Sequence, residues 1–311
     1  MPPTHSPILR QSLTTPFVQV GDWPTVILLT LCYAGWGGAL FVIPQFSMAL
    51  ACIALTLVLV LQSSLSHEIL HGHPFTSRRA NTALGLLAIG LFVPYIRFRD
   101  THLAHHVDEH LTDPYDDPES NFCDPIVWAA KPVWARALLR FNNTMFGRML
   151  VGPAISQWSF MVGDARAVMG GDWAVTRAWL LHLPAVILTL ICVQVAGMSI
   201  WMYVLVCYAA MSILKIRTYL EHRAEVDPTA RTVIVEGRGL LPFLFLNNSL
   251  HVVHHLHPNV AWYVLPRLYR DNKASYQACN EGYVYDSYAQ IFRRYFLKTK
   301  DPVPHPRWPL V

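Results

Sequence analysis

The chain has 311 residues, of which 53% are hydrophobic and only 14% are charged. Soluble domains average about 25% charged residues, so this composition excludes an ordinary water-soluble fold and indicates a membrane protein. The 24 Lys and Arg exceed the 20 Asp and Glu by four. This balance requires no nucleic-acid partner and is compatible with contact to anionic headgroups or to an acidic carrier protein.

The N-terminal part of the chain predicts a helical hairpin in the membrane. Residues 1–22 are polar, and no small-residue cleavage site follows a short apolar core, so we expect no removable signal peptide. Two uncharged blocks follow at 23–43 and 46–66, separated only by Pro44 and Gln45. Each is long enough to cross the bilayer as a helix, which takes about 20 apolar residues.

The next apolar segment, residues 81–95, is short, ends near Pro94 and is flanked by arginines. It predicts an interfacial or re-entrant helix rather than a span. A second uncharged pair, at 178–197 and 198–214, predicts a second transmembrane hairpin. The fold class is therefore an all-α membrane protein with four transmembrane helices in two hairpins plus an interfacial helix.

The basic residues predict the orientation of these spans. Neither hairpin turn contains Lys or Arg, so with four spans all 24 basic residues fall on one side of the membrane. Basic residues in short loops stay on the cytoplasmic side, which places both termini there, in the plasma (inner) membrane. The remaining chain on this side is predicted to form a cytoplasmic helical cap.

Most of the 15 histidines fall into three clusters beside the predicted spans: HEILH at 67–71, HLAHH at 102–106 and HVVHH at 251–255. Spacings of three and four residues place the imidazoles of a cluster on one helix face. His222 emerges on the same side, just beyond the fourth span. Neutral imidazole suits Zn, Cu, Fe and Ni, and nine ligands are too many for one ion.

The sequence therefore predicts two metal ions held by nine histidines. The predicted ligands are His67, His71, His102, His105, His106, His222, His251, His254 and His255. His73, His110 and His257 flank the clusters and are not predicted as ligands, nor are His5, His305 and the span residue His182.

Ligating imidazoles usually donate their second N–H to a carboxylate or amide. The polar side chains predicted for this supporting role are Glu68, Asp100, Glu221, Asn247 and Asn248. By contrast, Asp116, Asp117 and Glu119 lie in a proline-flanked loop after the second cluster and are predicted to be surface or helix-capping residues.

Three other functions compete for these histidines. HEILH also matches the H-E-x-x-H helix of zinc proteases, but such an enzyme would leave the other two clusters without a purpose. A metal transporter or a membrane b-type cytochrome would need its histidines at bilayer depth, where only His182 is predicted. The six cysteines are scattered without a C-x-x-C pair, so they predict neither a disulfide framework nor an iron–sulfur centre.

The clusters resemble the three histidine boxes of the membrane fatty acid desaturase and hydroxylase superfamily, which have the forms H-x(3,4)-H, H-x(2,3)-H-H and H-x(2,3)-H-H. The longer runs HEILHGHPF, RFRDTHLAHHVDEHLTDPYDDPES and NNSLHVVHHLHP are similar to a bacterial branch of it. The resemblance covers one membrane domain at 23–258, between cytoplasmic segments at 1–22 and 259–311. It implies that the nine histidines hold two irons and that O2 is a co-substrate.

Two departures from the family pattern concern the substrate. Three residues separate His67 from His71, as in lipid desaturases and alkane hydroxylases, whereas acyl-CoA desaturases have four. Thr218 stands where the acyl-CoA enzymes have an asparagine that reaches iron through water. The resemblance therefore implies a lipid or acyl chain taken from the membrane rather than an acyl-CoA.

Family frequency favours an acyl-lipid desaturase, with a hydroxylase or monooxygenase of an acyl chain or hydrocarbon as the alternative. The chain shows no flavin or nicotinamide glycine motif, so a separate ferredoxin, rubredoxin or cytochrome with its reductase is expected to supply electrons. The aromatic-rich segment 259–311, basic at 291–300, is expected to form a lid or to dock this donor, with core packing as the role of most rings.

Overall fold

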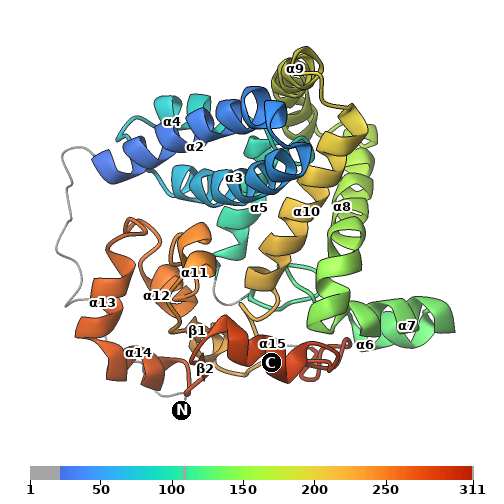
Figure 1. Ribbon diagram of the computed structural model, residues 1–311. Coiled ribbons are helices and arrows are strands. Elements are labelled where there is room, and N and C mark those ends of the chain that lie inside the picture. The colour runs from blue at the N-terminus through green and yellow to red at the C-terminus, as the bar shows by residue number, and fades with distance from the viewer. Residues whose placement is uncertain (1–21, 108–109, 310–311) are drawn as a thin grey trace.

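The computed structural model describes residues 22–107 and 110–309 and is mostly helical (Figure 1). Within these residues four helices are long and apolar enough to cross a membrane, which confirms the four predicted spans. They are α2 (Trp23–Phe41), α3 (Met48–Leu70), α9 (Trp173–Val195) and α10 (Ile200–Thr218). The predicted segment 1–22 lies outside the described residues except for Asp22, whose carboxylate caps α2 by accepting from the Thr25 N–H.

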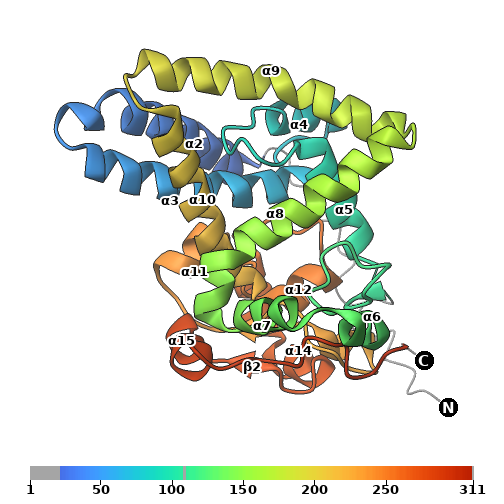
Figure 2. The same ribbon diagram turned by 90° about the vertical axis from the view of Figure 1, so that its right-hand side faces the viewer.

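The two hairpins differ in how closely their helices pack. Helices α2 and α3 lie against each other and turn through the short helix η1 (Ile43–Gln45), after which Ser47 caps α3. Helix α10 packs mainly on α3 and α8 rather than on α9, from which it is separated by a turn at Gly197. Both hairpin turns lie on the left of the molecule in Figure 2.

The predicted helix at 81–95 is interrupted. Helix α4 (Arg78–Gly85) ends early, and residues 86–94 run as irregular backbone to α5 (Tyr95–His105). Gly85 packs directly on the Tyr95 ring, where an added Cβ would lie 2.4 Å from two ring atoms. The irregular segment is therefore closer to a re-entrant loop than to a continuous interfacial helix.

Side chains from four surrounding helices satisfy the backbone of this loop. Backbone carbonyls need hydrogen-bond donors where water is excluded, and irregular backbone is tolerated at membrane depth only when protein supplies them. The donor and acceptor pairs are Tyr33 Oη to Leu87 O (3.0 Å), Tyr203 Oη to Ile89 O (2.8 Å), His182 Nε2 to Leu91 O (2.8 Å) and Gln157 Nε2 to Phe92 O (2.9 Å). His182 thus fixes backbone instead of binding metal.

A long helix that is not predicted from the sequence follows the second histidine cluster. The chain continues through α6 (Pro125–Ala130) and α7 (Val133–Asn142) into α8 (Met145–Met169), which leads to α9. Charged residues interrupt the hydrophobicity of α8, so no apolar block marks it. One of them, Asp164, accepts a bidentate pair of bonds from Arg97 of α5 and a bond from the Trp179 indole of α9, which joins three helices.

The rest of the described chain forms a cap beside the spans, at the bottom of both ribbon views. Its elements are η3 (Pro228–Arg231), β1 (Ile234–Val235), α11 (Leu240–Leu244), α12 (His251–Leu256), α13 (Leu265–Asp271), α14 (Lys273–Cys279), β2 (Val284–Tyr285) and α15 (Tyr288–Tyr295). The two strands pair in parallel, with Ile234 opposite Val284. Tyr283, Tyr285 and Tyr288 belong to the same buried cluster as the span residues, so these C-terminal rings serve in core packing.

Tyr203 provides a test of the re-entrant loop. Its fully buried hydroxyl donates to the Ile89 carbonyl and accepts from the Trp36 indole at 2.9 Å. Tyr203→Phe leaves both partners unsatisfied, so we expect the free energy of unfolding in mixed micelles to fall by about 1–3 kcal/mol. Tyr115→Phe, at an exposed tyrosine, is the control. Equal stability of the two variants would contradict this account of the loop.

Candidate metal centre

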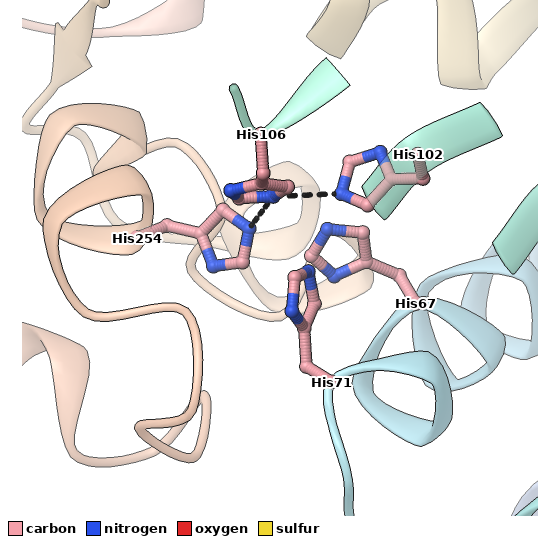
Figure 3. A group of neighbouring side chains, drawn as sticks. All are labelled: His67, His71, His102, His106 and His254. Carbon is pink, nitrogen blue, oxygen red and sulfur yellow. Dashed lines mark hydrogen bonds between the residues drawn. The ribbon is translucent and has the colours of Figure 1, made fainter. Parts of the chain in front are cut away.

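The structure brings all nine predicted histidines together in two neighbouring groups. The first contains His67 and His71 from the end of α3, His102 and His106 from α5 and its C-cap, and His254 from α12 (Figure 3). The second consists of His105, His222, His251 and His255. Within each group one ring nitrogen per residue lies within 4.8 Å of all the others. Segments separated by more than 100 residues in sequence thus converge on one place.

The inward-facing nitrogens of neighbouring rings nearly touch. In the first group, Nε2 of His106 lies 3.0 Å from that of His102 and 3.1 Å from that of His254. In the second, Nε2 of His222 lies 2.9 Å from that of His105 and 3.1 Å from that of His251. Two imidazoles bound to one metal at about 2.1 Å and at right angles would hold their nitrogens about 3 Å apart.

Hydrogen bonds at the outward-facing nitrogens leave the inward-facing nitrogens available to a metal ion. His102 Nδ1 donates to Glu119 at 2.8 Å and His105 Nδ1 donates to Asp117 at 2.7 Å. A neutral ring that carries its proton on Nδ1 has a lone pair on Nε2. In the first group Nε2 of His102 faces Nε2 of His106, and a cation between the two nitrogens could bind both.

His67 and His71 give a second indication. The Nε2 atom of each is buried and has no hydrogen-bond partner among the residues that the structure describes. Both rings face the other three histidines of their group in Figure 3. Buried polar atoms in proteins are almost always satisfied, so two orphaned nitrogens in one cluster fit a site built to receive a metal ion.

The residues that hold the imidazoles differ in part from those predicted. Asp117 and Glu119 are not surface or capping residues: both bond to box histidines, and the Asp117 carboxylate also accepts from the backbone of Thr112 and Glu119. Asp100 pairs instead with its neighbour Arg99, because it lies on an open side of α5. No sequence pattern predicts that Asp117 and Glu119 take the role expected of Asp100, because they lie 12 and 17 residues after the histidines that they contact.

The other predicted supporting residues lie closer to expectation. Asn248 accepts from His251 Nδ1 at 2.9 Å, and Glu221 lies 3.9 Å from the same nitrogen while pairing with Arg217. Glu68 lies 3.7 Å from His67 Nδ1 and accepts from the Trp262 backbone.

Asn247 donates to the Trp262 carbonyl rather than to a histidine, because its left-handed backbone, with φ of 57°, belongs to the turn before α12. It therefore shapes the connection to the third cluster.

The remaining described histidines lie outside both groups. His73 pairs with Asp22 at 2.8 Å, His110 is exposed, and His257 packs against Tyr276. His305 is buried beside the loop that carries Asp117, where its Nε2 lies 3.1 Å from the Thr112 hydroxyl. His5 lies outside the described residues.

Burial controls the protonation of the two groups. It lowers the pKa of His251, His254 and His255 well below the ordinary histidine value, and neighbouring imidazoles lower it further. These rings are neutral at physiological pH, which is the form that binds metal. His105 differs: burial opposes its protonation, but Glu119 and Asp117 raise its pKa to about 9. A metal ion at this nitrogen would displace a proton.

Comparison with known proteins agrees with this geometry. The family model described as fatty acid desaturase matches residues 44–288. A beta-carotene ketolase of Paracoccus sp. strain PC1 is 27% identical over 71% of this chain and 78% of its own. A beta-carotene ketolase of Paracoccus sp. strain N81106 is 26% identical over 65% of this chain and 71% of its own. No solved structure matches the chain significantly.

The division of the histidines into two groups leads to a prediction about the metal content of variants. Purified protein is expected to hold about two metal ions per chain, because each group offers enough imidazoles for one ion. His71→Ala and His251→Ala are each expected to lower this content, each by weakening its own group. His110→Ala, at an exposed histidine, is the control and is expected to keep both ions. Elemental analysis after anaerobic purification measures the content, and a metal-free wild type would exclude a two-metal site.

A substitution of Asp117 tests how a hydrogen bond to His105 affects metal affinity in the second group. Asp117→Asn removes the charge that orients His105, so metal affinity there is expected to fall about 10–100-fold. Asp116→Asn changes a neighbouring exposed carboxylate and is the matched control. Competition with a chelator gives the affinities, and equal affinity in the two variants would assign Asp117 a purely structural role.

Proposed function

The chain belongs to the fatty acid desaturase family, and from this premise we propose that it is a di-iron enzyme of the membrane that uses O2 to oxidise a C–H bond of a long apolar lipid. The observation that carries the proposal is the pair of buried histidine groups, with five and four members, at the ends of membrane helices. A zinc protease with a single metal ion would need only some of the histidines in one group and none of those in the other.

Iron is proposed from the family, and the residues present fit it. Imidazole suits iron as well as zinc or copper, and the nine histidines offer each of two ions four or five nitrogens. When bound, two ferrous ions would supply the capacity to activate O2 toward an unreactive C–H bond. The histidines of the two groups would hold them, and Asp117, Glu119 and Asn248 would orient three of those rings.

The chain's own residues prepare this site in two ways. Burial keeps imidazoles such as His254 and His255 in the neutral, metal-binding form. The hydrogen bonds at Nδ1 fix the ring planes before metal arrives, and such preorganisation of the supporting groups raises affinity. Because α3 and α10 end at the site, an apolar chain lying between the spans would approach the metal groups from the bilayer side.

Two outcomes of C–H oxidation remain candidates, and each has its own support. Desaturation of an acyl lipid is the reaction that gives the family its description. Oxygen insertion is supported by the two relatives, which act on beta-carotene as ketolases. Both substrate classes are long apolar molecules of the bilayer, so the four spans suit either. The outcome depends on how the chain of the substrate is placed at the site.

The enzyme also needs an electron source and a location. We propose a separate ferredoxin, rubredoxin or cytochrome with its reductase, because the sequence has neither a C-x-x-C pair nor a nucleotide-binding glycine motif. We propose the plasma membrane as its location, and the positive-inside rule supports an orientation with both termini and the metal centre on the cytoplasmic side.

Lipid mass spectrometry separates the outcomes. The chain is expressed in a host that makes acyl lipids, with and without beta-carotene, beside a donor and its reductase. A product lighter by two hydrogens identifies a desaturase, and a product that gains oxygen identifies an oxygenase. His254→Ala is expected to abolish the product, whereas His110→Ala retains it. No change in either lipid class, with both metal ions loaded, would contradict the proposed function.

A further inference from the structure

Exposed large apolar side chains occur along α8 from its first to its last turn: Phe146, Leu150, Trp158, Met161, Val168 and Met169. They lie on one broad side of the helix, where the inward-facing Gln157 and Asp164 interrupt them. Elsewhere α8 packs on α10. Helix α8 is not a candidate span, so its face is an additional apolar surface outside the four spanning helices.

The same surface continues onto α7. Val133, Trp134 and Leu138 are exposed, and Trp134 has 72% of its surface accessible. Trp134 and Leu138 lie on one side of α7, while Arg136 and Arg140 lie on the other side together with Val133, so the helix is amphipathic and turns an apolar side outward. Figure 2 shows α7 and α8 on the same outer face of the molecule, turned toward the viewer.

A row of phenylalanine rings joins α7 and α8 to the segment after α15. Phe141 lies 6.0 Å from Phe146, Phe146 lies 5.4 Å from Phe296, and Phe296 lies 6.3 Å from Phe292, measured between ring centroids. The Phe146 N–H also donates to the Phe296 carbonyl at 3.0 Å. Leu297 follows with 70% of its surface exposed. The apolar surface therefore spans three elements that fixed contacts hold together.

Exposed basic residues border this surface. Arg293 and Arg294 lie at the end of α15, and Lys298 follows Leu297. Aromatic and apolar side chains beside Arg and Lys are typical of helices that lie in the headgroup region of a membrane. Polybasic segments next to such helices attract anionic lipids.

We propose that α7, α8 and the segment Phe296–Leu297 form one membrane-contact surface that lies against the lipid and recruits anionic headgroups through Arg293, Arg294 and Lys298. Continuity identifies lipid as the occupant: α8 packs along the span α10 and leads through three residues into the span α9. An apolar surface of this extent, left in water, would be unusual for a protein. None of the residues of this surface belongs to the metal centre.

Nitroxide quenching tests the contact. Trp134→Cys and Leu297→Cys are labelled with a fluorophore in a background without Cys123 and Cys279, the two cysteines outside the spans, and the protein is reconstituted into vesicles with nitroxide lipids. Both labels are expected to be quenched severalfold more strongly than a label at Arg267→Cys. Arg267 is the matched control, with 78% of its side chain exposed on α13 of the cap. Equal quenching at all three positions would overturn the proposal.

The preference for anionic lipid has its own test. With the label at Leu297→Cys, a nitroxide on an anionic phospholipid is expected to quench more strongly than one on a zwitterionic phospholipid. Reversing Arg293, Arg294 and Lys298 to Glu should bring the two lipids to equal quenching, whereas reversing Arg267 and Arg270 should not.

An unchanged unfolding midpoint and an unchanged metal content verify the fold of the charge-reversed protein. Quenching that disappears as the protein-to-lipid ratio rises would show a second copy of the chain on this surface and would overturn the assignment to lipid.

Discussion

Nine imidazoles that face one another in a buried space are the constraint around which this molecule is organised. Lone pairs that point inward repel unless a cation lies between them, and polar rings are costly to bury without partners. Asp117, Glu119 and Asn248 satisfy the outer Nδ1 atoms of three rings, which leaves the Nε2 atoms of those rings to a metal ion. Helices α3 and α5 end where their rings converge, so the lengths of these helices determine where the site lies.

The distance between the first two histidine clusters creates a second demand, which the re-entrant loop meets. The chain leaves α3 at Leu70 and must return at Tyr95 to begin α5 beside it. A straight helix through 81–95 would carry the second cluster away from the first. The irregular backbone lets the chain return to the first cluster, but its carbonyls lack helical hydrogen-bond partners. Hydroxyl, imidazole and amide donors from α2, α8, α9 and α10 satisfy them. The position of the second cluster is thus fixed by all these helices together.

Sequence patterns predicted the parts of this structure that depend on local chemistry. Uncharged blocks of sufficient length identified the four spans, and spacings of three and four residues identified eight histidines of the two groups. The ninth, His222, was identified by its place just beyond the fourth span. They did not identify what depends on the path of the chain. Asp117 and Glu119 are as polar as any surface residue, and only the fold of their loop turns them toward His105 and His102. Helix α8 was missed because its charges, such as Asp164, find partners inside the protein.

Helix α8 connects the membrane-contact surface to the metal centre. Its Asp164 binds Arg97 of α5, the helix that carries His102 and His105, while the buried Arg148 lies over the Tyr219 ring, three residues before His222. Helix α8 therefore turns apolar residues such as Leu150 and Trp158 outward, while its Asp164 and Arg148 hold elements of both histidine groups. A helix that lies against lipid can move along the membrane normal only at the cost of exposing apolar surface. Contact with the lipid would then set the depth of the metal groups in the membrane, and so determine which carbon of a substrate chain reaches them.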